Sequence, residues 1–420
     1  MQNTPKSLRL QIGIFGRRNV GKSALLNALT GQEVSIVADY PGTTTDPVEK
    51  AMEMPPLGPV LWIDTAGLDD DEVISAIGAL RTERTRRVFE RIDMALLVST
   101  TDQWGRFEED LFHEFQERKI PVIVAMNKID IAPISDLFLE DFTEIKQKMV
   151  RVSAKTGEGL DELKEAIVEL APEDFLSSGG LLGDLVKPQK AVLLITPVDS
   201  EAPKGRMILP QAQATRDALD HDAYCITAKE NAVASALANM KELPVLAITD
   251  SRIFAAADAL LPREIPLTSF SILLARQKGD LAVCAVGAAA IASLKPASKI
   301  LIAEACSHHA VEEDIGRVKI PQWLEKYVGG KLDFTFAQGA DFPKDLSPFK
   351  LVIHCGACMF NRRAVLSRIL QCQKQQVPFT NYGVAIAFLH GILERALTPF
   401  PDALNHFLEA SKNNECEPGD

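Results

Sequence analysis

The sequence has no long hydrophobic run and little positive charge. Its longest apolar stretch, Leu281–Leu294, has 14 residues, whereas a helix that crosses a bilayer needs about 20. The net charge of −12 and the lack of aromatic side chains interleaved with basic ones argue against a protein that grips nucleic acid, because such binding needs a basic surface. We therefore expect neither a membrane nor a nucleic acid among its partners.

An export signal is also missing, because the segment Met1–Arg9 is polar and leads straight into an apolar strand. In such a chain the seven cysteines are expected to be thiols and metal ligands and not disulfides. A reducing, cytoplasmic location fits both observations. Cys225, Cys284 and Cys372 lie on periodic elements and are expected to be small buried apolar side chains.

The first chemical motif is a phosphate-binding loop. An apolar strand leads into Gly16–Ser23, which reads Gly-Arg-Arg-Asn-Val-Gly-Lys-Ser, and a helical run begins at Ala24. This is the GxxxxGK[ST] pattern in its strand, loop and helix context. The glycines let backbone N–H groups turn inward around the phosphates. Lys22 should reach the β- and γ-phosphates, and Ser23 should ligate Mg²⁺.

Three further motifs follow in the order that a GTP-binding domain requires. Asp64 can hold Mg²⁺ through water, and the N–H of Gly67 can sense the γ-phosphate. In the segment 127–130, Asn-Lys-Ile-Asp, the carboxylate of Asp130 can accept two hydrogen bonds that guanine donates and adenine does not. The segment 153–155, Ser-Ala-Lys, closes the base pocket. The predicted nucleotide-binding residues are Gly16, Asn19, Val20, Gly21, Lys22, Ser23, Ala24, Asp64, Gly67, Asn127, Lys128, Asp130, Ser153, Ala154 and Lys155.

These motifs resemble those of the TrmE–Era group of GTPases. The segment 42–46, Gly-Thr-Thr-Thr-Asp, matches the first switch of that group, which implies Thr44 as a second Mg²⁺ ligand. Leu68 stands where Ras-type switches carry a water-positioning Gln, and an apolar side chain cannot orient water. Asn19 matches a residue that helps to hold K⁺ in some members, although it could also only stabilise the loop. We expect slow, K⁺-stimulated hydrolysis of GTP to GDP and phosphate. The predicted catalytic residues are Lys22, Thr44 and Gly67.

The middle of the chain carries no catalytic equipment. The segment 173–189 contains Ser-Ser-Gly-Gly and Pro188 and reads as a linker. Over 190–270, short β-rich runs alternate with helical patterns, which predicts a small parallel α/β layer. A sheet with open edges fits a self-association module, and a plain structural spacer is the alternative.

The region 271–410 carries two clusters of potential metal ligands. After a long apolar helix predicted over 271–294, one strand runs into Cys-Ser-His at 306–308, and a later one runs into His-Cys-Gly-Ala-Cys at 354–358. Both clusters follow the carboxyl ends of strands, which is where α/β sheets bind ligands. The candidate ligands are Cys306, Cys355 and Cys358, with His308, His354, Glu312 or Glu313 for a fourth position.

Spacing alone leaves two kinds of metal site open. Three thiolates and one histidine form a common structural zinc site. Three thiolates around an open position fit a 4Fe-4S cluster with one exchangeable iron equally well. Each of the two imidazoles also fits a hydrogen-bonding neighbour of a ligand.

In the order of its parts the whole chain resembles the HydF family, the GTPases among the three FeFe-hydrogenase maturation proteins. The resemblance lies in the GTPase motifs, in the pattern C-x-H … H-C-x-x-C of 306–308 and 354–358, and in the segment 381–383, Asn-Tyr-Gly. It implies three α/β domains: a P-loop GTPase, a parallel dimerisation domain and a cluster-binding domain. It also favours a 4Fe-4S cluster over zinc, held by Cys306, Cys355 and Cys358.

The resemblance also implies partners and a task. The protein would be a homodimer that receives a precursor of the hydrogenase's diiron subcluster from two radical-SAM maturases and delivers it to the apo FeFe-hydrogenase. A zinc-binding GTPase metallochaperone and an RNA-related TrmE–Era GTPase are the alternatives. The expected boundaries are 1–172 for the GTP-binding domain, 173–189 for the linker, 190–270 for the dimerisation domain, 271–410 for the cluster-binding domain and 411–420 for a polar tail.

Overall fold

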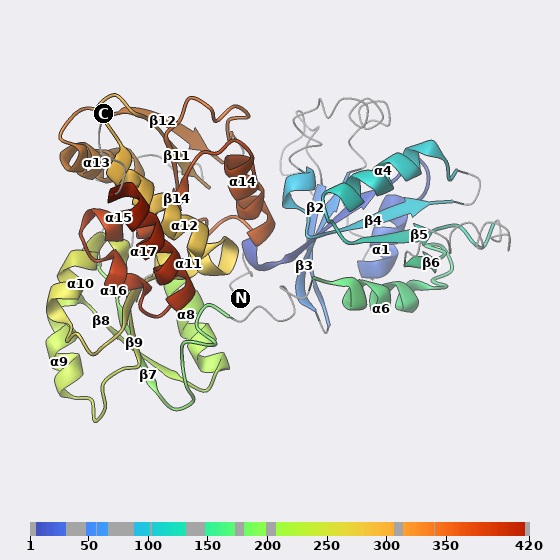
Figure 1. The fold of residues 1–420 in the computed structure, drawn as a ribbon. Helices are drawn as coiled ribbons and strands as arrows, with labels where there is room; N and C mark the ends of the chain where they lie inside the picture. The colour runs from blue at the N-terminus through green and yellow to red at the C-terminus, as the bar shows by residue number, and fades with distance from the viewer. Residues whose placement is uncertain are drawn as a thin grey trace. The chain divides into compact units, whose positions relative to one another are not determined.

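The computed structural model describes residues 6–30, 48–55, 57–65, 88–100, 103–131, 148–172, 180–198, 207–305, 314–339 and 341–415. By its contacts the chain divides into two compact units, Met1–Ser178 and Gly179–Asp420, and Figure 1 draws the elements of each. Both units are built from parallel strands and helices, which confirms the predicted α/β class. In the described part of the chain, every helix is too short or too polar to cross a bilayer.

The first unit is a six-stranded sheet in the order β2-β3-β1-β4-β5-β6, in which only β2 and β3 pair antiparallel. Every residue of β1, β4 and β5 is buried, as expected for central parallel strands whose two faces are both covered. The elements are β1 (Leu10–Phe15), α1 (Lys22–Thr30), β2 (Val48–Met54), β3 (Gly58–Asp64), β4 (Met94–Ser99), α4 (Arg106–Glu117), β5 (Val122–Met126), β6 (Met149–Arg151) and α6 (Leu160–Leu170).

The second unit contains two four-stranded parallel sheets, in the orders β10-β9-β7-β8 and β12-β11-β13-β14. The segment that forms the first sheet contains, in chain order, β7 (Ala191–Ile195), α8 (Leu209–Asp220), β8 (Tyr224–Ala228), α9 (Val233–Ala238), β9 (Leu246–Thr249), α10 (Phe254–Leu260) and β10 (Leu267–Ser269). The segment that forms the second sheet contains α11 (Phe270–Lys278), α12 (Leu281–Ala289), β11 (Lys299–Glu304), α13 (Ile320–Val328), β12 (Asp333–Gln338), β13 (Leu351–His354), α14 (Arg362–Lys374), β14 (Phe379–Asn381), α15 (Tyr382–Leu389), α16 (Leu393–Leu397) and α17 (Pro401–Glu415).

One hydrophobic core serves both sheets of the second unit. Helix α11 begins at the residue after β10 ends and contacts α8 and β10, which belong to the first of these sheets and its helices, as well as α14 and α15, which belong with the second. Leu181 and Leu182, from the segment predicted as a linker, are also buried in this core. The two domains of the second unit are therefore joined by packing as well as by the chain.

The structure corrects one predicted element. The apolar run 271–294 is not a single helix, because α11 ends at Lys278 and α12 begins at Leu281. Asp280 starts α12 as its cap, since its carboxylate accepts a hydrogen bond from the N–H of Val283 at 3.0 Å. The two helices contact each other and both contact α15 and β14, but α11 also packs on α8 and α14, whereas α12 packs on α17.

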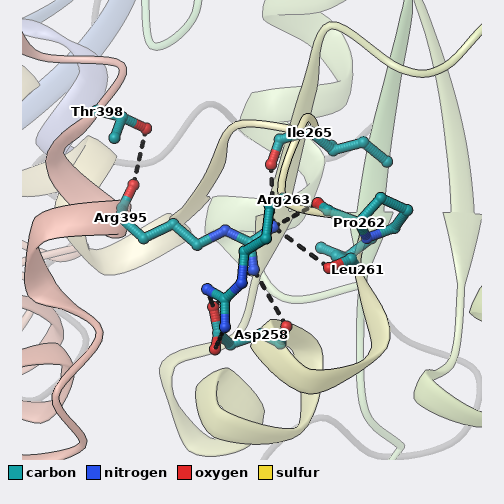
Figure 2. Close-up of polar contacts among 7 residues, drawn as sticks. All are labelled: Asp258, Leu261, Pro262, Arg263, Ile265, Arg395 and Thr398. Atoms are coloured by element: carbon teal, nitrogen blue, oxygen red, sulfur yellow. Dashed lines mark hydrogen bonds and ion pairs between the residues drawn. The ribbon is translucent and has the colours of Figure 1, made fainter.

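A cluster of polar contacts ties α16 to the first sheet's domain (Figure 2). Arg395 donates from Nη1 to Oδ1 of Asp258 at 2.7 Å, and from Nη2 to the carbonyl oxygens of Pro262 at 2.6 Å and Ile265 at 3.2 Å. The side chains of Arg395 and Asp258 are 11% and 12% exposed. Arg263, which also pairs with Asp258, is 72% exposed. Arg395 is thus the less exposed of the two arginines that pair with Asp258.

Candidate nucleotide-binding and thiol sites

The phosphate-binding loop follows β1 in a conformation that its glycines permit. Gly16 has φ +136°, and a Cβ atom there would lie 2.0 Å from the carbonyl oxygen of Val98. Gly21 has φ +96°, and a Cβ atom there would lie 2.4 Å from Nδ2 of Asn127. Both positions therefore need glycine for backbone angle and for space.

The charged and hydroxyl groups of this loop meet at the carboxyl edge of the sheet. Lys22 is buried and donates from Nζ to the carbonyl oxygen of Arg17 at 2.7 Å. Ser23 donates from Oγ to Oδ2 of Asp64, the last residue of β3, at 3.1 Å. The structure thus brings together two of the predicted Mg²⁺-binding residues, whose oxygens are the ligand type that Mg²⁺ prefers. Thr44 and Gly67 lie outside the described residues.

The base-recognition motif is held by its own hydrogen bonds. Asn127, just after β5, donates from Nδ2 to the carbonyl oxygen of Val20 at 2.8 Å and accepts at Oδ1 from the N–H of Ala154 at 3.0 Å. Ser153 donates from Oγ to Oδ1 of Asp130 at 2.7 Å. Three motifs far apart in the sequence are therefore tied into one site, and one carboxylate oxygen of Asp130 is fixed in place.

One residue of this site is not specified by any sequence motif. Arg17, in the phosphate-binding loop, pairs through Nε with Oε1 of Glu108 at 2.9 Å, and Glu108 is completely buried in the first turn of α4. The guanidinium of Arg17 also lies 5.2 Å from the ring centre of Phe107. The pattern GxxxxGK[ST] allows any residue at position 17. It therefore could not predict that Arg17 pairs with Glu108, which is 91 residues away.

The second site is the turn at residues 355–360, called here the thiol turn, which follows β13. Strands β11 and β13 are parallel neighbours in which Ala303 pairs with His354. The N–H of Ala305 donates to Sγ of Cys355 at 3.1 Å, and the N–H of Ala357 donates to the same sulfur at 3.4 Å. Two backbone dipoles therefore stabilise negative charge on this sulfur. Cys306, His308, Glu312 and Glu313 lie outside the described residues.

His354 is the predicted ligand that the structure uses differently. Its ring is 1% exposed, with Nε2 2.8 Å from Nη1 of Arg368 and Nδ1 2.8 Å from the carbonyl oxygen of Cys355. Because Arg368 can only donate, Nε2 accepts, and Nδ1 carries the proton that it donates to Cys355. Burial, followed by the Arg368 guanidinium, lowers the pKa of His354 to about 3. Both ring nitrogens are engaged by the protein, which argues against His354 as the fourth metal ligand.

Arg368 is itself held tightly. It projects from α14 and is 7% exposed, and its guanidinium lies 4.7 Å from the ring centre of Phe342 and 4.6 Å from that of Phe360. Contacts of a cation with two aromatic rings stabilise it away from water. The sequence pattern identified neither Arg368 nor Lys278, a buried lysine that contacts the thiol turn, because both approach from other helices.

The donors at the thiol turn fit a thiolate-bound metal. Metal ligation needs the thiolate form, and the two N–H groups on Cys355 and the nearby ammonium of Lys278 favour it. Hydrogen bonds to sulfur are also among the features that set the properties of iron–sulfur clusters. The described ranges, which omit Cys306, contain no group of three or more potential ligands.

Comparison with protein families matches each part of the chain. The hydrogen maturase F dimerization domain matches residues 181–279, and the hydrogen maturase F tetramerization domain matches residues 282–399. Together these two matches cover more than half of the chain. A 50S ribosome-binding GTPase domain matches residues 11–128.

Comparison with individual proteins gives GTPases that match less than half of this chain. GTPase Der of Wolinella succinogenes is 37% identical over 179 residues, which are 40% of this chain and 37% of that protein. The tRNA modification GTPase MnmE of a Nostoc species is 31% identical over 208 residues, 49% of this chain and 42% of that protein. The chain thus spans less than half the length of either relative.

Among solved structures, the G domain of the T. maritima FeoB iron transporter has 30% identity and a TM-score of 0.31, covering 39% of this chain and 99% of that one. Aquifex aeolicus Era bound to GDP·AlF4⁻ has 31% identity and a TM-score of 0.31, covering 39% of this chain and 57% of that one.

Proposed function

Because the chain belongs to the hydrogen maturase F family, we propose that it acts in FeFe-hydrogenase maturation as a GTPase and a carrier. Its C-terminal domain binds a 4Fe-4S cluster through Cys306, Cys355 and Cys358. It assembles or carries the precursor of the diiron subcluster and delivers it to the apo-hydrogenase. Three thiolate ligands leave one iron position of such a cluster exchangeable, which is the chemistry that a carrier of a diiron fragment needs.

The observation that carries this proposal is the contact between the ends of β11 and β13. The N–H of Ala305 donates to Sγ of Cys355 at 3.1 Å, and Cys306 is the next residue in the chain. Cys306 is therefore the chain neighbour of a residue whose N–H contacts the sulfur of Cys355. With both nitrogens of His354 engaged, the fourth position falls to His308, Glu312 or Glu313.

The first unit supplies the GTPase. GTP and Mg²⁺ bind through the phosphate-binding loop, Ser23 and Asp64, with Thr44 and Gly67 completing the site from the switch segments. Asn19 has φ +65°, a conformation that asparagine tolerates, and we assign it to a K⁺ site. Turnover should then rise several-fold when Na⁺ is replaced by K⁺, and Asn19→Ala should remove that difference. An equal rate in both salts would leave Asn19 as a loop residue only.

Self-association is supported by the hydrogen maturase F dimerization and tetramerization domains that match the second unit. We propose that the unit of function is a cytoplasmic homodimer formed through the domain of β7–β10. Its further partners are the two radical-SAM maturases, as donors, and the apo-hydrogenase, as acceptor. GTP binding and hydrolysis would change the order of the switch segments and so bias docking and release. Equal affinity for each maturase in the GTP-, GDP- and nucleotide-free states would exclude that coupling.

Anaerobic reconstitution with iron and sulfide tests the cluster site. The wild type should hold about four irons and four sulfides per chain and give the electron paramagnetic resonance signal of a reduced 4Fe-4S cluster. Cys306→Ser, Cys355→Ser and Cys358→Ser should each lose it while keeping GTP hydrolysis. Cys225→Ser is the matched control, because that half-buried thiol lies on β8. One zinc per chain without sulfide would instead support a zinc-binding GTPase metallochaperone.

An RNA-related GTPase is the remaining alternative. The curated GTPase MnmE is named for tRNA modification, but its likeness covers 49% of this chain and the net charge here is −12. Such a charge disfavours binding to a phosphate backbone. Salt-dependent binding of tRNA at submicromolar concentration would overturn this judgement.

A further inference from the structure

Lys278 connects α11 to the thiol turn. It is the last residue of α11 and is 3% exposed. Its Nζ atom donates to the carbonyl oxygens of Ala357 at 3.0 Å, Cys358 at 3.1 Å and Phe360 at 2.8 Å. One side chain thus holds three of the six residues of the turn, from about 80 residues away in the sequence.

The three contacts match the three N–H donors of a charged lysine side chain. A neutral amine has two N–H bonds, whereas an ammonium has three, and each of the three carbonyl oxygens needs a donor. Carbonyl oxygens carry only partial negative charge, so a buried ammonium is stabilised fully only by an anion nearby. Burial lowers the pKa of Lys278 to about 8, and the side chains of Cys358 and Cys355 counter part of that shift.

The shape of the turn also depends on this lysine. Ala357 has φ +53°, a left-handed conformation that a residue with a Cβ atom rarely adopts without support. Its carbonyl oxygen accepts from Lys278, and its N–H donates to Sγ of Cys355 at 3.4 Å. The same residue that is strained is therefore bonded to the lysine on one side and to a predicted ligand on the other.

We propose that Lys278 is a positioning residue of the thiol site. Its side chain fixes the thiol turn for ligation by Cys355 and Cys358, and its buried positive charge balances the negative charge of a metal centre bound by thiolates. The inference rests on the proposed function only in naming that metal as an iron–sulfur cluster. A cluster with three thiolates is anionic and becomes more so on reduction, so a fixed cation close to it raises its reduction potential. Removing the charge should shift the potential to more negative values.

Three variants separate charge from packing. Lys278→Met keeps the length of the side chain without charge, Lys278→Gln keeps two donors without charge, and Lys278→Arg keeps charge and donors. Lys374→Met is the matched control, because Lys374 is an exposed lysine at the end of α14 in the same domain. Each reconstituted protein is titrated anaerobically, with the reduced-cluster signal as the readout and iron content measured in parallel.

The expected result is a negative shift of the midpoint potential, with lower iron retention after gel filtration, in Lys278→Met and Lys278→Gln. Lys278→Arg should have a midpoint potential and an iron content close to those of the wild type, and Lys374→Met should match the wild type in both. If Lys278→Met does not fold, Lys278→Gln carries the same comparison. Wild-type potential and iron content in the Met or Gln variant would overturn the proposal, as would an equal shift in Lys374→Met.

A second probe keeps the test independent of the proposed cluster. Titration of the reduced apo-protein with Co²⁺ reports thiolate ligation by its absorption bands, with no iron or sulfide present. Weaker Co²⁺ binding in Lys278→Met, by at least tenfold, and recovery in Lys278→Arg would support the positioning role even if the wild type held no cluster. Unchanged Co²⁺ affinity in Lys278→Met would refute it.

Discussion

Asp130 follows β5 at the edge of the first unit, where Oγ of Ser153 donates to its Oδ1 at 2.7 Å. Its carboxylate is predicted to accept hydrogen bonds from the guanine edge. In Asp130→Asn the acceptor becomes partly a donor that faces the N–H groups of guanine, so GTP affinity should fall by about 10⁴-fold. Xanthosine triphosphate, which presents an oxygen where guanine has its amino group, should bind this variant better than GTP does.

Calorimetric titration with both nucleotides measures these affinities. The matched control is Asp161→Asn, since the Asp161 side chain is 93% exposed at the start of α6, and it should bind GTP like the wild type. Undiminished GTP affinity in Asp130→Asn would show that the guanine edge is read by another residue.

The buried cysteines of the second unit should be unreactive in the native apo-protein. Cys284 is 1% exposed and Cys372 is fully buried. Burial raises the pKa of Cys372 to about 12 and that of Cys284 still further. Only the thiolate is alkylated, so at pH 8 fewer than about one in a thousand Cys372 side chains is reactive at a given moment. Peptide mapping after iodoacetamide should find neither residue labelled before urea is added and both labelled afterwards.

The contacts that join Ser23 to Asp64 and Asn127 to Ala154 connect motifs that the sequence shows, whereas the contacts of Lys278 and Arg368 at the thiol turn could not be predicted from it. Gly16–Ser23 is a contiguous pattern whose spacing is dictated by the phosphates. Lys278 and Arg368 reach the thiol turn from α11 and α14, and no spacing rule relates them to Cys355. His354 was predicted as a possible ligand because sequence shows the residue type but not the two hydrogen bonds that engage its ring.

At the scale of elements, β8 is the exposed edge of its sheet. Among the strands that the structure describes it pairs with β7 alone, and the N–H of Tyr224 donates inward to the carbonyl oxygen of Lys190 at 3.1 Å. Because inward and outward N–H groups alternate along a strand, those of Cys225 and Thr227 point to the free edge. Edge strands of this kind pair readily with a second copy.

We expect Thr227→Pro to abolish dimer formation, because it removes an outward N–H and leaves the inward ladder intact. Light scattering after size exclusion should then give half the mass of the wild type. Thr227→Val, which keeps the N–H, should remain dimeric. A dimeric Thr227→Pro protein would place the interface on another surface.

Periodicity predicted most elements but missed the break between α11 and α12. The run 271–294 is apolar throughout, so its hydrophobic pattern cannot reveal where a helix stops. The signal that could have found the break is Gly279-Asp280, a weak helix former followed by a good N-cap residue. The break matters because it leaves Lys278 at a helix end, where its side chain reaches the thiol turn.

At the scale of the whole molecule, Arg395 joins the two domains of the second unit. Arg395→Met would remove its bonds to Asp258, Pro262 and Ile265 and leave Asp258 with Arg263 alone. Breaking a buried ion pair costs roughly 3–5 kcal/mol, and we expect about 3 kcal/mol at most here because the pair is only partly buried and Arg263 still pairs with Asp258. Arg263→Met, which removes an exposed partner, should cost less than about 1 kcal/mol.

Calorimetry of the full chain measures both variants. GTP with Mg²⁺ should raise the unfolding temperature of the first unit by mass action and so identify its transition. The remaining transition belongs to the second unit and should fall in Arg395→Met. Equal unfolding temperatures in the two variants would mean that the domains are held together by the apolar core alone.

The order of the three domains could be predicted because each motif is local in the sequence. The way in which the second and third domains share a core could not, since Arg395 and Asp258 are 137 residues apart. The burial of Leu181 and Leu182 in that core is likewise a tertiary fact, because a short apolar patch between glycines reads as a linker with no specified neighbour.

The seam between the two family domains, residues 279–282, falls beside a helix that both halves need. Six of the nine residues of α11 are buried, against elements on either side of the seam. A gene divided there would yield an amino-terminal half with a bare apolar helix and a carboxyl-terminal half with an open groove where that helix belonged. Such halves should precipitate when made separately and complement each other when made in the same cell.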